Sequence, residues 1–488
     1  MNDMTQPSYT IRLTEAVARN PQVRLAAPVS LEIKLGEHIA IAGPNGAGKS
    51  LLVDLMTGKY PLAAGQIEYI FDSWPDKTIY NNVKYITFRD TYGSTDANYY
   101  YQQRWNVHDQ DEIPLVRDLL GTPSQLEQSD SLLDIFNLRP LLDKRIILLS
   151  SGELRKFQIA KALLTGPFIL IMDNPFIGLD ANARDTLFEL LEQLTILGAV
   201  QIVLVVSRPD DIPPFITHVI PVENKTVQPK MTRRDYLATL PGLPPATGND
   251  LEKRIFSLPY THEDYTADEV ISLNHVSIRY DDRTILRDLD WTVCRGERWA
   301  LSGENGAGKS TLLSLVCADN PQAYACDIRL FGRRRGTGES IWEIKRHIGY
   351  VSPEMHRAYL KNLPALDIVA SGLHDSIGLY RRPRPEELDT CRWWMETFGI
   401  GHLEARPFLT LSSGEQRLCL LARAFVKDPE LLILDEPLHG LDTANRALVR
   451  RIIDAFCHRL DKTLVMVTHY EEELPPCIDH RLRLVRQH

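Results

Sequence analysis

The sequence has 488 residues, 44% hydrophobic and 24% charged, which is enough for two or three globular cores. It has no apolar run of about 18 residues and no secretion signal at its start, which argues against a transmembrane helix and against export. The net charge of −9 gives no general reason to bind nucleic acid, and the seven cysteines form no C-x-x-C pair, so we expect reduced thiols. These features predict a soluble, cytoplasmic protein.

The first element with a chemical signature is an apolar run at 39–42, typical of a strand, followed by a glycine-rich loop. The loop consists of Gly43, Pro44, Asn45, Gly46, Ala47, Gly48, Lys49 and Ser50. In such a loop the backbone N–H groups close around phosphates, the lysine pairs with the β- and γ-phosphates, and the serine hydroxyl ligates Mg²⁺. The pattern predicts an ATP·Mg²⁺ site.

Three more segments complete the first half of the chain. Residues 149–153, which include Ser150, Ser151, Gly152 and Glu153, open a helical pattern that extends to 164. The apolar run 168–172 ends in Asp173, which is typical of a buried parallel strand that brings a carboxylate to the metal edge of a sheet. A third apolar run ends at 207–208, and residues 229–267 then form a proline-rich stretch that predicts a linker with a short helix near 233–240.

The same order of segments returns in the second half. Its phosphate loop consists of Gly303, Glu304, Asn305, Gly306, Ala307, Gly308, Lys309 and Ser310, with Thr311 following. The two lysines are 260 residues apart (309 − 49). The segment with Ser412, Ser413, Gly414 and Glu415 and the strand that ends in Asp435 are both offset by 262 residues (414 − 152 and 435 − 173). Nearly constant offsets identify a tandem duplication, so two chance glycine-rich turns are excluded.

This ordered set resembles the ATP-binding cassette (ABC) family over nearly the whole chain. The resemblance implies two α/β P-loop NTPase domains, 8–228 and 268–488, each a mostly parallel sheet with an inserted helical subdomain, joined by linker 229–267. It also implies ATP and Mg²⁺ as ligands, with Ser50, Asp173, Ser310 and Asp435 at the metal. In that family two cassettes associate head to tail, and each ATP also meets the partner's signature segment. The segments at 150–153 and 412–415 look like that signature, with Ser and Glu in place of the usual Gly and Gln.

The two copies differ where the family performs chemistry. The carboxylate after the metal-binding Asp and a later histidine serve hydrolysis in the family, and the second copy has both, Glu436 and His469. The first copy has Asn174 and Arg208 instead, and an amide cannot take up a proton. The family also stacks adenine on an aromatic residue such as Tyr280, whereas residues 14–26 hold none. We therefore expect a degenerate first site that retains ATP and one hydrolytic second site, although neutral drift with slow turnover at the first site would give the same pattern.

Two classes of function fit these cassettes. Segments 330–336, 339–342, 348–352 and 371–378 resemble the fused-pair ATP-binding proteins of molybdate transport, which implies an energising subunit that docks on separate membrane permease subunits at the inner face of the cell membrane. The alternative is a non-transport ATPase acting on a cytoplasmic macromolecule, as in the ABC-F ribosome factors, or in a regulatory or repair role. Those factors usually carry a longer charged linker and a catalytic Glu in both halves. Importers normally carry a Gln after the strand that follows the P-loop helix, where this chain offers Glu354 and Asp90.

Three further patterns have a structural and a functional interpretation. The run 333–335 of three arginines is expected to be a solvated loop rather than a phosphate site. The aromatic residues at 99–101 and 105 are expected to form a small core rather than a stacking surface. The helical pattern 386–398 is expected to bury at least one of its two tryptophans, Trp393 and Trp394.

Overall fold

The structure is a computed structural model, and it describes residues 9–71, 78–87, 114–121, 130–146, 149, 151–177, 179, 181–198, 200–240, 249–258, 267–280, 283–459 and 462–486. The described residues form two compact units. In the described residues, the first unit contains 9–240 and the second contains 249–486. No described helix has both the length and the apolar character needed to cross a bilayer.

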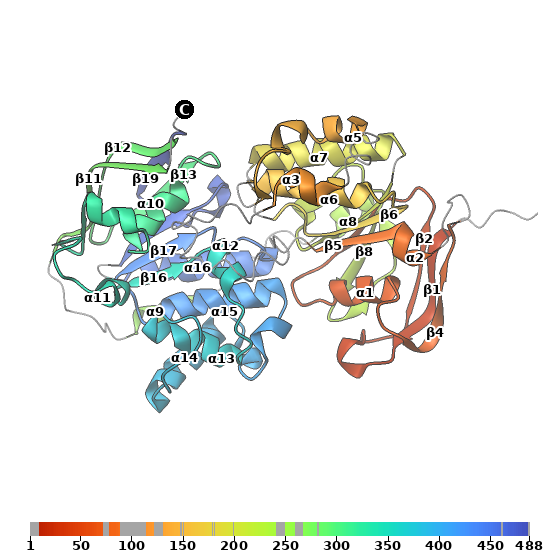
Figure 1. Cartoon of the computed structure of the whole chain (residues 1–488). Coiled ribbons are helices and arrows are strands. Elements are labelled where there is room, and N and C mark those ends of the chain that lie inside the picture. The colour runs from red at the N-terminus through yellow and green to blue at the C-terminus, as the bar shows by residue number, and fades with distance from the viewer. Residues whose placement is uncertain are drawn as a thin grey trace, which may run out of the picture. The chain divides into compact units, whose positions relative to one another are not determined.

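The first unit contains an antiparallel sheet of order β2-β1-β4 and a central sheet of order β10-β8-β3-β7-β6-β5, with β9 on β8 (Figure 1). Its strands are β1 (Tyr9–Ala18), β2 (Val29–Lys34), β3 (Ile39–Ala42), β4 (Leu62–Tyr69), β5 (Val83–Thr87), β6 (Ile169–Asp173), β7 (Gln201–Val206), β8 (His218–Glu223), β9 (Thr226–Val227) and β10 (Met231–Thr232). Its helices are α1 (Lys49–Met56), α2 (Ile79–Asn82), α3 (Val116–Leu120), α5 (Asp130–Ile135), α6 (Ser151–Leu163), α7 (Ala181–Ile196) and α8 (Arg233–Thr239).

The second unit contains an antiparallel sheet of order β12-β11-β14-β15 and a parallel sheet of order β16-β17-β18-β13-β19. Its strands are β11 (Glu269–Tyr280), β12 (Arg283–Cys294), β13 (Arg298–Gly303), β14 (Asp327–Leu330), β15 (Arg333–Arg334), β16 (Ile348–Val351), β17 (Leu431–Asp435), β18 (Thr463–Val467) and β19 (His480–Leu484). Its helices are α9 (Asn249–Phe256), α10 (Lys309–Val316), α11 (Ile341–Lys345), α12 (Pro353–Ala358), α13 (Ala365–Ala370), α14 (Pro385–Thr397), α15 (Ser413–Phe425) and α16 (Thr443–Cys457).

The two central sheets repeat one topology. In the first unit the parallel strands run β5-β6-β7-β3-β8, and in the second they run β16-β17-β18-β13-β19, which is the same order of equivalent strands. The register repeats as well, since Tyr85 pairs with Ile171 and Tyr350 pairs with Ile433. Strands buried on both faces explain the continuous apolar runs of the sequence. The predicted fold class, two tandem α/β P-loop domains with mostly parallel sheets, is confirmed.

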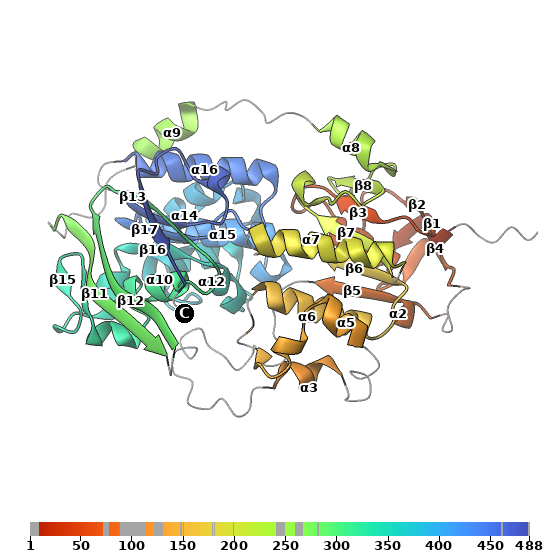
Figure 2. The ribbon, with the colours of Figure 1, turned by 90° about the horizontal axis from the view of Figure 1, so that it is seen from above.

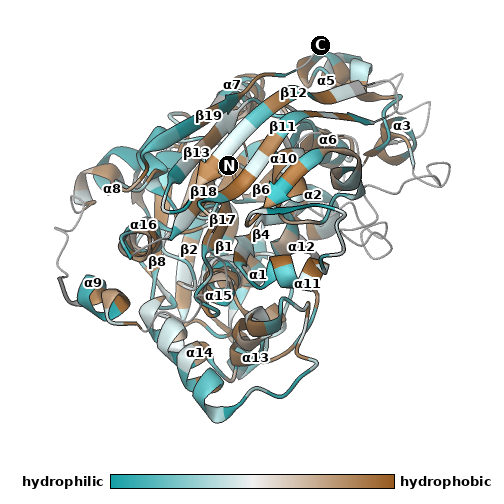
Figure 3. Cartoon of the chain, turned by 90° about the vertical axis from the view of Figure 1, so that its left-hand side faces the viewer, coloured by the Kyte–Doolittle hydropathy of each residue, from teal (hydrophilic) through white to brown (hydrophobic). Residues whose placement is uncertain are grey.

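Helices α13, α14 and α15 of the second unit pack on one another and form its inserted helical part (Figure 1). Trp394 on α14 is 1% exposed and packs against Phe398 and Phe425, so the expectation that this helix buries a tryptophan is met. Hydrophilic and hydrophobic residues both occur along α14 (Figure 3), as expected for a helix with one buried face.

The proline-rich stretch between the phosphate-loop domains is partly folded. Strand β10 pairs with β8 of the first unit, and helix α8 follows it where the short helix is predicted. Helix α9 packs against α16 of the second unit (Figure 2). The described parts of this stretch therefore belong to the two units, β10 and α8 to the first and α9 to the second.

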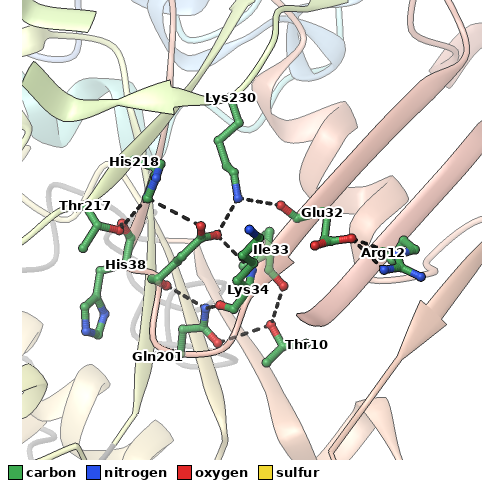
Figure 4. Close-up of polar contacts among 11 residues, drawn as sticks. Thr10, Arg12, Glu32, Ile33, Lys34, His38, Gln201, Thr217, His218 and Lys230 are labelled. Atoms are coloured by element: carbon green, nitrogen blue, oxygen red, sulfur yellow. Dashed lines mark hydrogen bonds and ion pairs between the residues drawn. The ribbon is translucent and has the colours of Figure 1, made fainter. Parts of the chain in front are cut away.

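A partly buried polar network joins the loop before β10 to the rest of the first unit (Figure 4). Lys230 Nζ donates to Oε2 of Glu37 at 2.5 Å and to the carbonyl of Glu32 at 2.8 Å. Gln201 Nε2 donates to the carbonyls of Lys34 and Glu37 at 2.8 and 2.6 Å. Burial alone would raise the pKa of Glu37, but the Lys230 ammonium and the Lys34 N–H outweigh it and lower that pKa. These hydrogen bonds pair backbone carbonyls of β2 and of the turn that precedes β3. They therefore stabilise the strand that leads into the first phosphate loop.

The arginine run of β15 and the turn after it differs in part from the expectation of a solvated loop. Arg333 and Arg334 are exposed, but Arg335 is only 3% exposed. Its Nη1 donates to Glu339 Oε1 at 2.5 Å, and its guanidinium lies over the ring of Tyr324. The expectation was wrong for Arg335, because a carboxylate four residues later and an aromatic ring compensate its burial.

Replacing Glu339 with Ala is expected to lower the free energy of unfolding by about 3–5 kcal/mol, because the buried Arg335 charge loses its partner. Urea unfolding followed by tryptophan fluorescence measures this change. Arg333→Ala is the matched control, and since its ion pair is exposed we expect a change of about 0–1 kcal/mol. Equal effects of the two substitutions would contradict the assignment of a buried pair.

Candidate functional site

Each unit places its glycine-rich loop between a central strand and the helix that begins at the loop's lysine. Helix α1 begins at Lys49 after β3, and α10 begins at Lys309 after β13. Gly48 and Gly308, which precede the lysines, have φ of 103° and 97°, a region that glycine adopts without strain. The two loops are therefore built alike.

The loop lysines are held over their own loops. Lys49 Nζ donates to the carbonyls of Gly43 and Pro44 at 2.7 and 2.8 Å. Lys309 Nζ donates to the carbonyls of Gly303 and Glu304 at 2.6 and 3.1 Å. A lysine ammonium and a helix N-terminus facing the same loop form a cradle for a polyphosphate. Both units have this cradle.

The second unit gathers its acidic residues beside the phosphate loop. Asp435 ends β17, and the pKa of its carboxyl is raised by burial and by the nearby carboxylates of Glu436 and Glu354, against the opposing charges of Arg417 and Lys309. Asp435 is therefore close to both Lys309 and Glu354. Glu354 is the residue near the position at which importers carry a Gln.

Glu436 is held in a left-handed conformation at the end of β17. Its φ is 48°, and its N–H donates to the carbonyl of Val467 on β18 at 2.9 Å. Arg417 on α15, 2% exposed, donates through Nη2 to the carbonyls of Asp435 and Glu436 at 2.8 and 2.6 Å. A non-glycine residue in this conformation requires support from its surroundings, which the strand and the guanidinium provide.

Two histidines contact the Glu436 carboxylate. His469 Nε2 lies 3.1 Å from Oε1, and His439 Nδ1 lies 3.1 Å from Oε2. Burial would raise the pKa of Glu436, but the two imidazoles outweigh it and lower that pKa, so the carboxylate is ionised. His469 was predicted from the sequence, whereas His439 was not.

The first unit holds an amide network at the equivalent place. Asn174 has φ of 51°, and its Nδ2 donates to Asp173 Oδ1 at 2.8 Å. Tyr85 on β5 donates its hydroxyl to Asp173 Oδ2 at 3.0 Å and also hydrogen-bonds Ser50. Burial and the Asp173 charge raise the pKa of Tyr85. The structure thus brings the two predicted metal ligands of the first unit, Ser50 and Asp173, to one tyrosine that sequence reasoning missed.

Arg208, which stands where the second unit has His469, is surrounded by acidic side chains. It lies 3.5 Å from Asp210 and 3.9 Å from Asp211. Arg184 of α7 also pairs with Asp211, at 3.0 Å. The positive charge of Arg208 is thus partly offset within the first unit.

The second signature segment is a helix start with reciprocal caps. Ser412 precedes α15, and its hydroxyl accepts from the N–H of Glu415, whose carboxylate accepts from the N–H of Ser412 at 2.7 Å. A capping box takes either Glu or Gln at this position, so the Glu in place of the family's usual Gln keeps the cap. In the first unit α6 begins at Ser151, Gly152 and Glu153 lie in its first turn, and Ser150 lies outside the described residues.

The residue predicted to meet adenine is half-buried. Tyr280 ends β11, packs against the core beneath it, and accepts a hydrogen bond from Asn320 Nδ2 at 2.8 Å. An aliphatic residue lies against the last loop glycine in both units, Leu25 at Gly48 and Leu286 at Gly308, so this contact does not distinguish them. Adenine stacking on Tyr280 stays a prediction.

The residues at the proposed metal position suit Mg²⁺. Ser310 and Asp435 offer hard oxygen atoms, and no group of three or more His, Cys, Asp or Glu side chains arranged to hold a metal occurs within the described ranges. Mg²⁺ is usually held by one or two protein oxygens together with substrate phosphates and water, so a sparse oxygen site is the expected form. Asp90 and the aromatic residues at 99–101 and 105 lie outside the described residues.

The strand-loop-helix cradles and parallel sheets define a P-loop nucleotide-binding protein with two such domains. The ABC transporter family model matches residues 26–177 and 286–439, and the chain belongs to this family. It is 37% identical to the ABC transporter ATP-binding protein ModF of Escherichia coli (strain K12), over 93% of this chain and 92% of that protein. It is 30% identical to an uncharacterised ABC transporter ATP-binding protein of Schizosaccharomyces pombe, over 93% of this chain and 94% of the other.

A solved structure shares the fold over most of the chain. It contains an archaeal ribosome recycling factor, aABCE1, in complex with the ribosomal stalk protein aP1. The similarity has a TM-score of 0.52 at 17% identity and covers 96% of this chain and 87% of that one. At this level of identity the similarity supports the fold alone.

Proposed function

We propose that the chain is an ATPase that hydrolyses ATP mainly at the site beginning at Lys309 and retains ATP at the site beginning at Lys49. The observation that carries the proposal is Glu436, an ionised carboxylate held between two imidazoles, where the first unit has the amide of Asn174. Both phosphate loops have the same geometry, so both are expected to bind nucleotide. The units differ in the group that activates water.

In this mechanism Lys309 moves from its loop carbonyls to the β- and γ-phosphates of bound ATP. Glu436 accepts a proton from the attacking water, and His469 donates a hydrogen bond toward the γ-phosphate. Ser310 and Asp435 would hold Mg²⁺, which neutralises charge that develops on the phosphates. As in the family, we propose head-to-tail pairing, with Ser412 and Gly414 serving the site of Lys49, and Ser150 and Gly152 serving the site of Lys309.

We also propose that the chain energises a transport system as a cytoplasmic protein that docks on separate permease subunits at the membrane. The similarity to ModF over nearly the full length of both chains supports this role, and the resemblance of segments 330–336 and 339–342 makes molybdate the proposed cargo. A departure from an importer's pattern is the absence of a Gln at the expected place, where the chain has Glu354 and Asp90.

The Glu436→Gln protein with ATP is expected to capture a polytopic membrane protein from detergent-solubilised membranes, because ATP-bound cassettes that cannot hydrolyse should stay docked. The control is the protein that carries both Lys49→Ala and Lys309→Ala. It lacks both phosphate-binding lysines, so adding ATP should not change which proteins it captures. Recovery of ribosomes or soluble proteins alone would contradict the transport proposal and favour a soluble macromolecular target.

A further inference from the structure

The loop that follows Glu436 carries a second histidine that the family pattern does not explain. His439 lies three residues after Glu436, and its N–H donates to the Glu436 carbonyl at 3.1 Å. This turn directs the imidazole back to the carboxylate, with Nδ1 3.1 Å from Oε2. His469 approaches the other oxygen, Oε1, from the end of β18. The two imidazoles therefore hold opposite oxygens of one carboxylate.

The first unit shows that the turn itself does not require a histidine. Ile177 is the equivalent residue (439 − 177 = 262, the offset that relates Asp173 to Asp435). Its N–H donates to the carbonyl of Asn174 at 3.3 Å, which is the same backbone bond. The histidine is thus found in the copy that has the carboxylate, and the apolar residue in the copy that has the amide.

The two ring nitrogens of His439 are in unequal environments. Because a carboxylate only accepts, Nδ1 carries the proton in the bond to Glu436. Nε2 is buried and has no hydrogen-bond partner among the residues that the structure describes. A buried histidine with a purely structural role normally has both nitrogens satisfied. The contact that His439 does make is directed at the group that activates water.

We propose that His439 is a positioning residue for hydrolysis: its Nδ1–H fixes Oε2 of Glu436 and so orients the carboxylate toward the attacking water. In the proposed mechanism His469 donates toward the γ-phosphate, so His439 is the donor that stays on the Glu436 carboxylate and restricts its rotation. The inference rests on the proposed function, because it acts through Glu436. It adds a residue to which the sequence analysis assigned no role, and it predicts a specific kinetic signature.

Replacing His439 with Ile, the residue of the first copy, is expected to lower kcat for ATP hydrolysis by about 10- to 100-fold with KM unchanged, because a misplaced base loses rate without losing substrate binding. His439→Asn places an amide N–H where Nδ1 stood and should restore most of the rate. His439→Gln keeps a polar side chain but places its amide farther out, and should not. The matched control, Ile177→His, should leave kcat unchanged because Asn174 provides no carboxylate.

The same substitutions are then made in the Glu436→Gln protein, where His439→Ile should cause no further loss. A His439→Ile protein with wild-type kcat, an Asn variant as slow as the Gln variant, or a loss that persists without Glu436 would each overturn the positioning role. Should the Ile variant not fold, the comparison of Asn with Gln decides the question. Failure of the proposed function is distinct, since the Glu436→Gln protein would then itself remain active.

Discussion

Glu436→Gln is expected to lower the rate of ATP hydrolysis by about 10²- to 10⁴-fold while ATP binding remains near the wild-type level, because general-base catalysis contributes about this factor. The amide keeps the size of the side chain and still accepts a hydrogen bond, but it cannot take the proton from water. The carboxylate that is lost lies 3.1 Å from His439 and from His469, and both imidazoles lower its pKa. Steady-state phosphate release and ATP binding at equilibrium measure the two quantities separately.

Glu472→Gln is the matched control for this substitution. Glu472 is an exposed acid three residues after His469, so the same chemical change is made on the nearby surface. We expect the Glu472→Gln protein to hydrolyse ATP at the wild-type rate. A Glu436→Gln protein that hydrolyses ATP as fast as the Glu472→Gln protein would remove Glu436 from the mechanism.

The nucleotide cradles and the sheets were predictable because their signals are local. A strand, a glycine-rich loop and a helix are adjacent in the sequence at both Lys49 and Lys309, and the buried strands β6 and β17 each appear as an apolar run that ends in Asp. The constant offsets between the copies then required one topology for both, which the strand orders confirm.

The side chains that tune the sites were not predictable in the same way. Tyr85 reaches Asp173 across two neighbouring strands, 88 residues apart, and Arg417 reaches Glu436 from a helix, 19 residues away. No sequence spacing indicates these contacts, since they depend on strand order and packing. His439 could have been found from the sequence, because comparison of the two copies at the same offset shows Ile177 in its place.

The difference between the sites also predicts what nucleotide the protein holds after turnover. Both lysines are held over similar loops, so both sites should fill with ATP. The first unit has Asn174, engaged with Asp173, and Arg208 at the positions of Glu436 and His469, and neither an amide nor a guanidinium takes a proton from water. ATP at Lys49 should therefore survive many turnovers at Lys309.

The central claim is tested most directly by incubating the wild-type protein with Mg²⁺ and labelled ATP, removing free nucleotide rapidly, and identifying the bound nucleotide after acid quenching. We predict comparable amounts of intact ATP and ADP in the wild type, ATP alone in Glu436→Gln, and loss of the ATP fraction in Lys49→Ala. Bound ADP without ATP in the wild-type protein would show that both sites hydrolyse, and would contradict the assignment of one retaining and one hydrolytic site.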